Sequence, residues 1–475
     1  MPICGVFFVS RFPRARARAP PRRVVARSLA VANRVSTPHF MPRRPRAEFE
    51  AEASAAATPK RLPGASYWRR LAPGLHVKDE EYIAGVLSHE IALKPAVIEQ
   101  CKAQLIQDGF FTLPPEALPW ANISLKAMRV GVKRLQRRGW PATLLLAYDE
   151  VWALAHQLSH LMAAVSGGCV NSLDMLAWSV TPALGQSGFA PHRDRQPADV
   201  GRSFREDGTA RYTTAWIALS EATPENSCLY LVPRQHDPGY DEGDDQSPDA
   251  EDPLIRVLRS DAAVQAMRAC PLRPGGAVFF THRAMHWGSK GQLQCTTPRV
   301  SVSFGHSDPT FEPPFFSTAG HSLPFPKLSL RCALAAAQLI NYHERFEFGL
   351  PMLRRFGATY RAHLDDFSPE YAEKTAAEFM AACHDRKRRQ KAGGAADEAP
   401  PAAASAPKMR KKAPKSTGIK AQGAERLDPR PRVVGGVDDD DDDDDDAALD
   451  DALDAMLDAQ GKAAHNLYDD FDDWA

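Results

Sequence analysis

Short apolar runs separated by turn-forming residues dominate the middle of the chain. Between residues 175 and 304 these runs are interrupted by Pro, Gly, Asn and Asp, a texture typical of the short strands of a β-sandwich or barrel. The segments expected to form strands are Met175–Val180, Thr213–Leu219, Cys228–Val232, Ala277–Thr281 and Val300–Phe304. The pattern predicts a β-rich centre for the folded part of the chain.

Apolar residues at helical spacing flank this centre on both sides. Tyr82–Ala103 has mixed helical spacing, and Pro95 within it suits the first turn of a helix. Val151–Val165 and Leu328–Phe346 have a similar helical texture. We therefore expect a folded domain over residues 63–370, mainly β with helices packed outside the strands.

The formal net charge of zero, from 59 basic and 59 acidic residues, hides a strong asymmetry between the two ends of the chain. Residues 1–62 form a basic leader in which many arginines precede the first acid, Glu48. An arginine-rich, acid-poor leader is typical of a transit peptide, which would direct the chain to a mitochondrion or plastid. The alternatives are a disordered basic leader and a true start at Met41, with the protein then in the cytoplasm or nucleus.

Residues 371–475 are expected to form a largely disordered tail. It carries two basic clusters, Arg386–Lys391 and Lys408–Lys415, and an unbroken acidic run, Asp438–Asp446. Blocks of like charge repel one another and stay solvated. Such basic runs attract phosphate, so nucleic-acid binding is an alternative, but no basic face interleaved with aromatic residues supports it, and the clusters suit nuclear import equally well. The alternating acids and aromatics of Leu467–Trp474 suit either a docking motif for a protein partner or a merely soluble tail.

The eight cysteines are scattered along the chain without a Cys-x-x-Cys pair. This distribution argues against a zinc site and against a disulfide framework, and it favours a reducing compartment. Apolar runs are also too short for a transmembrane segment, which needs roughly 18–20 residues. The longest candidate, Leu144–Val165, is interrupted by charged residues and histidines.

A His-x-Asp pattern follows the first predicted strand, in Pro191-His192-Arg193-Asp194. Residues i and i+2 of a strand point to the same face, so the imidazole of His192 and the carboxylate of Asp194 are expected to enter one cavity. The pattern alone is a weak signal, because a chain this rich in acids contains about one by chance. The preceding strand and the glycine-containing turn at 182–190 provide the context that strengthens it.

A third ligand would complete the 2-His-1-carboxylate arrangement, which leaves open positions on iron(II). The glycine-bounded apolar run at 275–281 has the pattern of a buried strand, and His282 and His286 follow it. A histidine after a strand is more often a surface or hydrogen-bonded residue than a ligand. The residues by themselves therefore leave both histidines open as candidates.

An arginine, Arg299, leads into the predicted strand Val300–Phe304, which is an unusual place for a charge. The planar guanidinium forks onto carboxylates with two parallel hydrogen bonds. If the strand lines the same cavity as the histidines, Arg299 would hold the carboxylate of a co-substrate. The alternative is a surface arginine at the start of a strand.

Together these pieces resemble the phytanoyl-CoA dioxygenase family of iron(II)/2-oxoglutarate oxygenases, over roughly residues 100–305. The matching segments are Cys101–Phe111 (a helix running into an Asp-Gly-aromatic step), Pro191–Asp194 (His-x-Asp), Ala215–Leu219 (Trp-x-Ala-Leu), Pro224–Leu229 (Glu-Asn-Gly-x-Leu), Val232–His236 (Pro-Gly-Ser-His), Phe279–Ser289 (the strand of the distal histidine) and Arg299 (the co-substrate arginine).

The resemblance implies a role for each matching residue. His286 ranks ahead of His282 as the third ligand, because the family's ligand stands just before a Gly-Ser. Iron(II) would then be bound by His192, Asp194 and His286, and 2-oxoglutarate would be anchored on Arg299. The remaining co-substrate is dioxygen, with ascorbate as an optional reductant. By position, Trp216 and Ser289 would lie beside 2-oxoglutarate, although Trp216 is equally well explained as an ordinary core aromatic.

Three positions depart from the family's pattern. Ser227 stands where a glycine usually follows the asparagine, and Arg234 where a glycine usually follows the proline. Trp287 is an apparent insertion between His286 and the following Gly-Ser. We expect the first two to change the turns that contain them and Trp287 to reshape the pocket wall near the metal.

The family's fold is a double-stranded β-helix, a cupin-like jelly roll with helices outside it. The resemblance implies a dioxygenase that hydroxylates a small-molecule or lipid-like substrate with release of succinate and carbon dioxide. A protein hydroxylase and a catalytically silent scaffold that acts as an interaction module are alternatives. A cupin-type metalloenzyme that does not use 2-oxoglutarate is a further one, in which the charge of Arg299 would have no evident purpose.

Overall fold

Two antiparallel sheets form the centre of the fold. The computed structural model describes residues 61–195, 200–244, 251–317, 324–346 and 348–393. The larger sheet has the order β1-β6-β3-β8-β2, with β1 at Phe110–Leu113, β6 at Ala277–Thr281, β3 at Tyr212–Ala218, β8 at Arg299–Ser307 and β2 at Val170–Val180. The smaller sheet has the order β5-β4-β7, with β5 at Arg268–Cys270, β4 at Leu229–Leu231 and β7 at His286–Gly288.

Side chains along β8 alternate between two environments. The apolar residues Val300, Val302 and Phe304 are buried in the main hydrophobic core. The intervening residues, from Arg299 through Ser301 and Ser303 to Gly305, line a pocket on the opposite face. Because successive residues of a strand point to opposite faces, one short sequence provides both the core and the wall of a polar site.

The same division holds across the neighbouring strands. On β3, Ala215 and Ile217 belong to the main core, whereas Trp216 joins a second, smaller cluster between the sheets. On β2, Met175 and Ala177 face the main core, and Trp178 lines the pocket. The larger sheet thus has one face that packs on helices and one face that is turned to the pocket.

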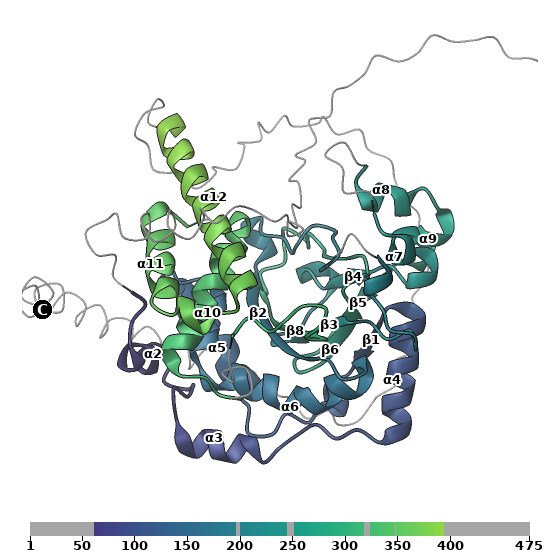
Figure 1. The fold of residues 1–475 in the computed structure, drawn as a ribbon, viewed down its shortest axis with the longest axis horizontal. Helices are drawn as coiled ribbons and strands as arrows, with labels where there is room; N and C mark the ends of the chain where they lie inside the picture. The colour runs from purple at the N-terminus through teal and green to yellow at the C-terminus, as the bar shows by residue number, and fades with distance from the viewer. Residues whose placement is uncertain (1–60, 196–199, 245–250, 318–323, 347, 394–475) are drawn as a thin grey trace, which may run out of the picture. The chain divides into compact units, whose positions relative to one another are not determined.

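Helices cover the outer face of the larger sheet and surround its edges (Figure 1). Helix α6 contacts β2, β3 and β8, α10 contacts β2, and α4 lies against β1 at the other edge. The helices are α2 Ala65–Leu71, α3 Glu80–Leu87, α4 Pro95–Asp108, α5 Leu125–Arg137, α6 Asp149–Ser166, α7 Pro238–Glu242, α8 Pro253–Leu258, α9 Asp261–Ala266, α10 Leu328–Asn341, α11 Leu350–Arg361 and α12 Pro369–Gly393. No helix of the described residues is long and apolar enough to span a membrane.

The predicted strands are present in the structure, and helix α4 begins at Pro95 as expected. The helices nevertheless hold more residues than the strands in the described part of the chain, so the description "mainly β" fits the centre of the fold better than the whole. The prediction emphasised strands because the candidate site residues lie on strands or next to them. Several helices, among them α5 and α11, were not predicted.

The folded part also continues beyond residue 370, where the tail was expected to begin. Helix α12 spans that position and buries Phe379 and Cys383 in the main core. Arg386, in the first basic cluster, is buried and donates hydrogen bonds to the carbonyls of His343 and Phe348. The charged stretch therefore begins as the end of a packed helix. The predictions for residues 1–60 and 394–475 lie outside the described residues.

A buried ion pair joins the start of α6 to α10. Asp149 and Arg331 are 0% and 1% exposed, and the Arg331 guanidinium donates to the Asp149 carboxylate. The same carboxylate accepts the backbone N–H groups of Lys78 and Asp79 at 3.2 and 3.0 Å. This one side chain therefore holds three segments of the chain together.

Replacing Asp149 by alanine should lower the free energy of unfolding by about 3–5 kcal/mol, because it leaves the buried charge of Arg331 without its partner. Urea unfolding followed by circular dichroism measures the change. In contrast, Glu116→Ala removes the solvent-exposed pair with Arg273 and should leave the unfolding midpoint where it is. Equal losses in the two variants would contradict this assignment.

Candidate metal centre

Two histidines from distant parts of the chain face each other across an antiparallel bridge. The N–H of His192 donates to the carbonyl of His286 at 3.0 Å, and the reverse hydrogen bond has the same length. Directly opposed residues of such a pair project their side chains to the same side. The two imidazole rings consequently lie with their centroids 4.3 Å apart.

The carboxylate of Asp194 completes a group of three. One ligand atom from each of His192, Asp194 and His286 lies within 4.8 Å of the others. Asp194 Oδ1 is 3.6 Å from Nε2 of His192 and 3.5 Å from Nε2 of His286. The sequence thus predicted correctly that these three side chains converge, with His286 and not His282 as the second imidazole.

Hydrogen bonds at the other ring nitrogens orient both imidazoles. Nδ1 of His192 lies 2.7 Å from the carbonyl of Ala190, and Nδ1 of His286 lies 3.0 Å from that of Ala284. A carbonyl only accepts, so each Nδ1 must carry a hydrogen, and in the neutral ring the lone pair is then on Nε2. Burial lowers the pKa of His192 to about 3, with the neighbouring His286 adding to the shift, so this ring is neutral near pH 7. These are the tautomer and charge state that metal-binding histidines adopt.

The carboxylate is oriented from β3. Thr214 donates its hydroxyl hydrogen to Oδ2 of Asp194 at 2.5 Å, which leaves Oδ1 directed at the two Nε2 atoms. Two oriented imidazoles and one oriented carboxylate form a donor set that suits a divalent first-row metal with positions left open. The residues present therefore fit a metal ion.

Arg299 lines the same pocket as the three candidate ligands. Its side chain donates to the carbonyl of Ser227 at 3.0 Å and to the hydroxyl of Ser301 at 2.7 Å, and its guanidinium lies 5.3 Å from the ring centre of Trp216. Arg299 is 2% exposed, and no carboxylate of the described residues pairs with it. Burial lowers the pKa of Arg299 to about 10, which still leaves it charged at neutral pH.

The predicted residue Ser289 does not line the pocket with the others. Its hydroxyl is directed at the carbonyl of Pro224, 3.3 Å away, and its N–H donates to Cys228. His282 is likewise absent from the lining and places Nδ1 3.0 Å from the carbonyl of Tyr212. Trp216, by contrast, lines the pocket and also belongs to the smaller hydrophobic cluster, so its place beside a co-substrate stays a prediction.

The expectation that Trp287 reshapes the pocket wall is wrong. On β7, His286 and Gly288 line the pocket, whereas Trp287 points to the other face and stacks on Tyr230 with 5.7 Å between ring centres. A side chain at Gly288 would meet the backbone of Gly188, because a Cβ there would lie 2.7 Å from its Cα. The extra residue thus places a glycine at the inward position, where only a hydrogen fits.

Several polar residues of the pocket were not predicted from the sequence. Thr214, Asp174 and Tyr212 line it, and Arg195 contacts the last two. Their only signal in the sequence was alternation: Tyr212 and Thr214 share the inward face with Trp216. Nothing in the sequence indicated that a serine, threonine or acid at those positions was more than a strand residue.

Comparison with known proteins agrees with this geometry. Residues 136–291 match the family described as "Phytanoyl-CoA dioxygenase (PhyH)". This segment includes all three candidate ligands and ends before Arg299. This part of the chain is similar to the phytanoyl-CoA dioxygenase family.

One curated relative is the phytanoyl-CoA dioxygenase domain-containing protein 1 of Danio rerio, which is 26% identical over 145 residues. The match covers 28% of this chain and 50% of the relative, so the chain spans only half of the relative's length. Among solved structures, the epimerase SnoN with Fe3+, alpha ketoglutarate and nogalamycin RO is 20% identical, covering 46% of this chain and 86% of that one, with a TM-score of 0.35. HygX from Streptomyces hygroscopicus, with nickel and 2-oxoglutarate, is 14% identical, covering 46% and 87%, with a TM-score of 0.32.

The two other departures from the family's pattern have structural consequences. Arg234 donates to the carbonyl of Ile106 at 2.8 Å near the end of α4 and pairs with Asp241, so it ties a turn to a helix. Ser227 adopts the left-handed conformation with φ of 81°, which glycine adopts without strain. The Ser227 hydroxyl is buried and has no hydrogen-bond partner among the described residues.

Replacing Ser227 by glycine should raise the free energy of unfolding by about 1 kcal/mol, because it removes left-handed backbone strain and an unpaired buried hydroxyl. Ser227→Ala removes the hydroxyl and keeps the strain, so it should be less stable than Ser227→Gly. Thermal unfolding of the three proteins gives the order. If the alanine variant equals the glycine variant, backbone strain at Ser227 is not the cause.

Two buried histidines away from the metal ligands should make stability depend on pH. Burial lowers the pKa of His282 to about 3 and that of His306 to about 4, against roughly 6.5 in an unfolded chain. Below pH 6.5 the unfolded chain therefore binds protons that the folded chain does not. The contribution of each neutral ring to the free energy of unfolding is fully present above pH 6.5. As the pH drops from 6.5 toward 4, each histidine lowers the free energy of unfolding by about 1.4 kcal/mol per pH unit.

The variant His282→Asn keeps a side-chain N–H for the Tyr212 carbonyl and removes the titrating ring. From pH 7 to pH 5, the metal-free variant should lose about 2 kcal/mol less stability than the wild type. Urea unfolding at the two pH values measures the difference. Exchange of the exposed His89 for asparagine serves as the control and should retain the wild-type dependence. An unchanged pH dependence in His282→Asn would show that His282 is not buried in its neutral form.

Proposed function

We propose that this protein is an iron(II)/2-oxoglutarate-dependent dioxygenase that hydroxylates an apolar small-molecule or lipid-like substrate. The observation that carries the proposal is the combination of His192, Asp194 and His286 with Arg299 in one pocket. The family match supports it. The three candidate ligands alone, or the buried arginine alone, would be compatible with other functions. A three-ligand site beside a buried arginine that has no carboxylate partner suits a metal enzyme with a dicarboxylate co-substrate.

The three ligands would hold iron(II) on one side and leave its other positions open to the pocket. When bound, iron and 2-oxoglutarate supply dioxygen activation, with release of succinate and carbon dioxide and hydroxylation of a substrate C–H bond. The chain itself contributes fixed geometry. The Ala190 and Ala284 carbonyls hold the rings of His192 and His286, and Thr214 holds the Asp194 carboxylate.

Arg299 would bind the far carboxylate of 2-oxoglutarate. A buried guanidinium without a carboxylate is costly to the folded protein, and an anionic co-substrate would offset that cost. The hydroxyl of Ser301 and the carbonyl of Ser227 hold two of its donors, which fixes the plane of the guanidinium before the co-substrate arrives. Trp216 would shield the pair from water.

An aromatic wall on the other side of the ligands suits an apolar substrate. Trp178, Phe189 and Tyr342 line the pocket there. The ring of Phe189 lies 4.7 Å from that of Trp178, 6.2 Å from that of Tyr342 and 5.8 Å from that of His192, between ring centres. Nε1 of Trp178 is buried without a hydrogen-bond partner among the described residues.

The proposal includes a double-stranded β-helix for the fold. Its support is the pair of antiparallel sheets whose strands β7 and β8 supply His286 and Arg299 to a pocket between them. The helices outside the larger sheet would then serve as the packing layer that lets the inner face stay polar.

Purified protein with iron(II) and ascorbate should convert 2-oxoglutarate to succinate, slowly in the absence of substrate. Asp194→Ala should abolish this conversion. Arg299→Met should raise the KM for 2-oxoglutarate by about 100-fold, because it removes charge-assisted hydrogen bonds to a buried carboxylate. Succinate formation, measured by chromatography, is the readout for all variants.

The exposed arginine Arg273, which is 64% exposed, provides the matched control. Arg273→Met should leave the KM for 2-oxoglutarate unchanged. Equal turnover by the wild type and Asp194→Ala would contradict the proposed metal site. Absence of turnover in the wild type, with iron and 2-oxoglutarate present, would favour a scaffold that has lost catalysis.

A further inference from the structure

Arg195 directly follows the carboxylate ligand and contacts its backbone. Its Nη1 donates to the carbonyl of Asp194 at 2.8 Å, and its own N–H donates to the carbonyl of His282 at 3.3 Å. A side chain that returns to the peptide of the preceding residue restricts how that peptide can rotate. The direction of the Asp194 side chain depends on this rotation.

Two carboxylates hold the guanidinium of Arg195 in place. Glu312 accepts from Nε at 2.5 Å and from Nη2 at 2.8 Å, and Asp174 accepts from Nη2 at 2.9 Å. The guanidinium also lies 4.6 Å from the ring centre of Tyr212, whose hydroxyl donates to Asp174 at 3.0 Å. With only 17% of its side chain exposed, Arg195 is fixed from three directions.

A strained bulge places Asp174 where it meets Arg195. The register of β2 against β8 shifts between Asn171 and Met175, and Leu173 in this bulge has φ of 69°. Left-handed backbone at a leucine costs of the order of 1–3 kcal/mol and is retained where the surrounding structure requires it. Gly305 leaves the space that this arrangement needs, because a Cβ there would lie 2.1 Å from the Tyr212 hydroxyl.

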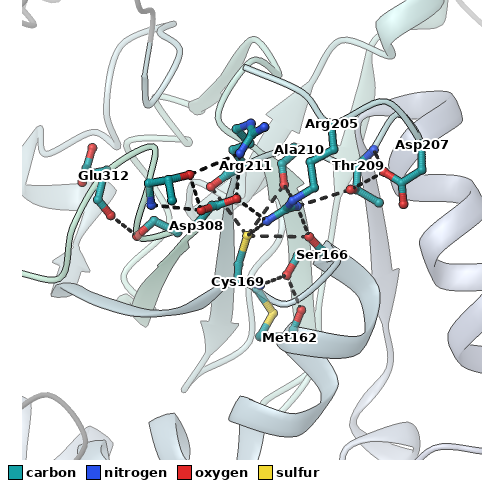
Figure 2. Close-up of polar contacts among 12 residues, drawn as sticks. Met162, Ser166, Cys169, Arg205, Asp207, Thr209, Ala210, Arg211, Asp308 and Glu312 are labelled. Carbon is teal, nitrogen blue, oxygen red and sulfur yellow. Dashed lines mark hydrogen bonds and ion pairs between the residues drawn. The ribbon is translucent and has the colours of Figure 1, made fainter. Parts of the chain in front are cut away.

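The turn after β8 fixes Glu312, and Figure 2 shows the cluster that holds this turn. The centre of this cluster is Asp308, whose Oδ2 accepts hydrogen bonds from Arg205 at 2.9 Å and from Arg211 at 2.8 Å. The N–H of Glu312 donates to the carbonyl of Asp308 at 3.0 Å, and the carbonyl of Glu312 accepts from the Ser307 hydroxyl at 2.6 Å. Glu312 therefore meets Arg195 from an anchored backbone.

We infer that Arg195 is a positioning residue, which sets the orientation of the Asp194 carboxylate toward the metal through the Asp174–Arg195–Glu312 network. This inference rests on the proposed function, since it assigns a role within the same site. The neighbouring Arg193 is buried and paired with Asp237 and Asp244 but donates to the carbonyl of Arg283, not to a ligand residue. Two arginines flank Asp194, and Arg195 is the one whose guanidinium contacts it.

Lysine cannot replace Arg195 in this role. The guanidinium uses Nε, Nη1 and Nη2 on three separate groups, and their directions are fixed by its plane. A lysine ammonium keeps the charge but presents its donors from a single atom. Arg195→Lys should therefore retain an ion pair with one carboxylate and lose the grip on the Asp194 carbonyl.

Cobalt(II) binding to the metal-free full-length chain, followed by visible absorption, tests the inference without relying on turnover. Arg195→Lys should weaken cobalt binding about 10- to 100-fold, as outer residues that orient metal ligands commonly do, and should alter the absorption bands. Arg331→Lys is the control, because this arginine is also buried and ion-paired but does not line the pocket. It should lower stability and leave the affinity and the bands unchanged.

Glu312→Gln provides a milder second variant, which keeps an acceptor and removes the charge. It should weaken cobalt binding by less than Arg195→Lys does, and the double variant should match Arg195→Lys alone, because Glu312 acts through Arg195. Wild-type affinity in both Arg195→Lys and Glu312→Gln would overturn the inference, as would an equal loss in Arg331→Lys. If the wild-type chain itself binds no cobalt, the proposed function fails and not only the role of Arg195.

Discussion

Two backbone hydrogen bonds between His192 and His286 join a loop after β2 to strand β7, and the candidate metal centre exists only where they form. Antiparallel bridging makes the two residues direct neighbours and places both rings on one side. Each ring then turns its Nδ1 to a carbonyl two residues earlier in its own segment. Asp194 is two residues after His192 and therefore points to the same face, so this one pairing of segments brings three candidate ligands together.

Among the buried arginines of the described residues, Arg283 and Arg299 form no ion pair with a carboxylate, and only Arg299 of these two lines the pocket. Arg193 and Arg331 are buried and Arg195 is 17% exposed, and each is paired with at least one carboxylate, so their desolvation is compensated within the chain. Arg299 is buried as deeply without such a partner among the described residues. An uncompensated charge of this kind lowers stability, and its presence in a pocket is best explained by an anionic ligand.

The departures from the family's pattern show how substitutions are accommodated around a fixed site. Trp287 adds a residue after His286, and the alternation of β7 sends it away from the pocket while Gly288 faces inward. Arg234 gains a helix carbonyl and an acidic partner in place of a glycine. Ser227 keeps an unrelieved cost, because its backbone is left-handed and its buried hydroxyl has no partner among the described residues, while its carbonyl accepts from Arg299.

The sequence by itself predicted the strands and left His282 and His286 both open as the third ligand, and the resemblance to the family then ranked His286 first. Period-two alternation and the order of the motifs are local properties, and they survive folding because backbone geometry enforces them. It did not reveal Thr214, Asp174, Arg195 and Glu312 as parts of the site, nor that Ser289 turns away from it. The positions of these residues depend on a bulge, a turn and a bridge between segments that are far apart in the chain. Such features are stabilised by contacts with distant residues, which no local sequence pattern specifies. The end of the folded part was missed for the same reason, since α12 is held by its buried face against other helices and not by its charged sequence.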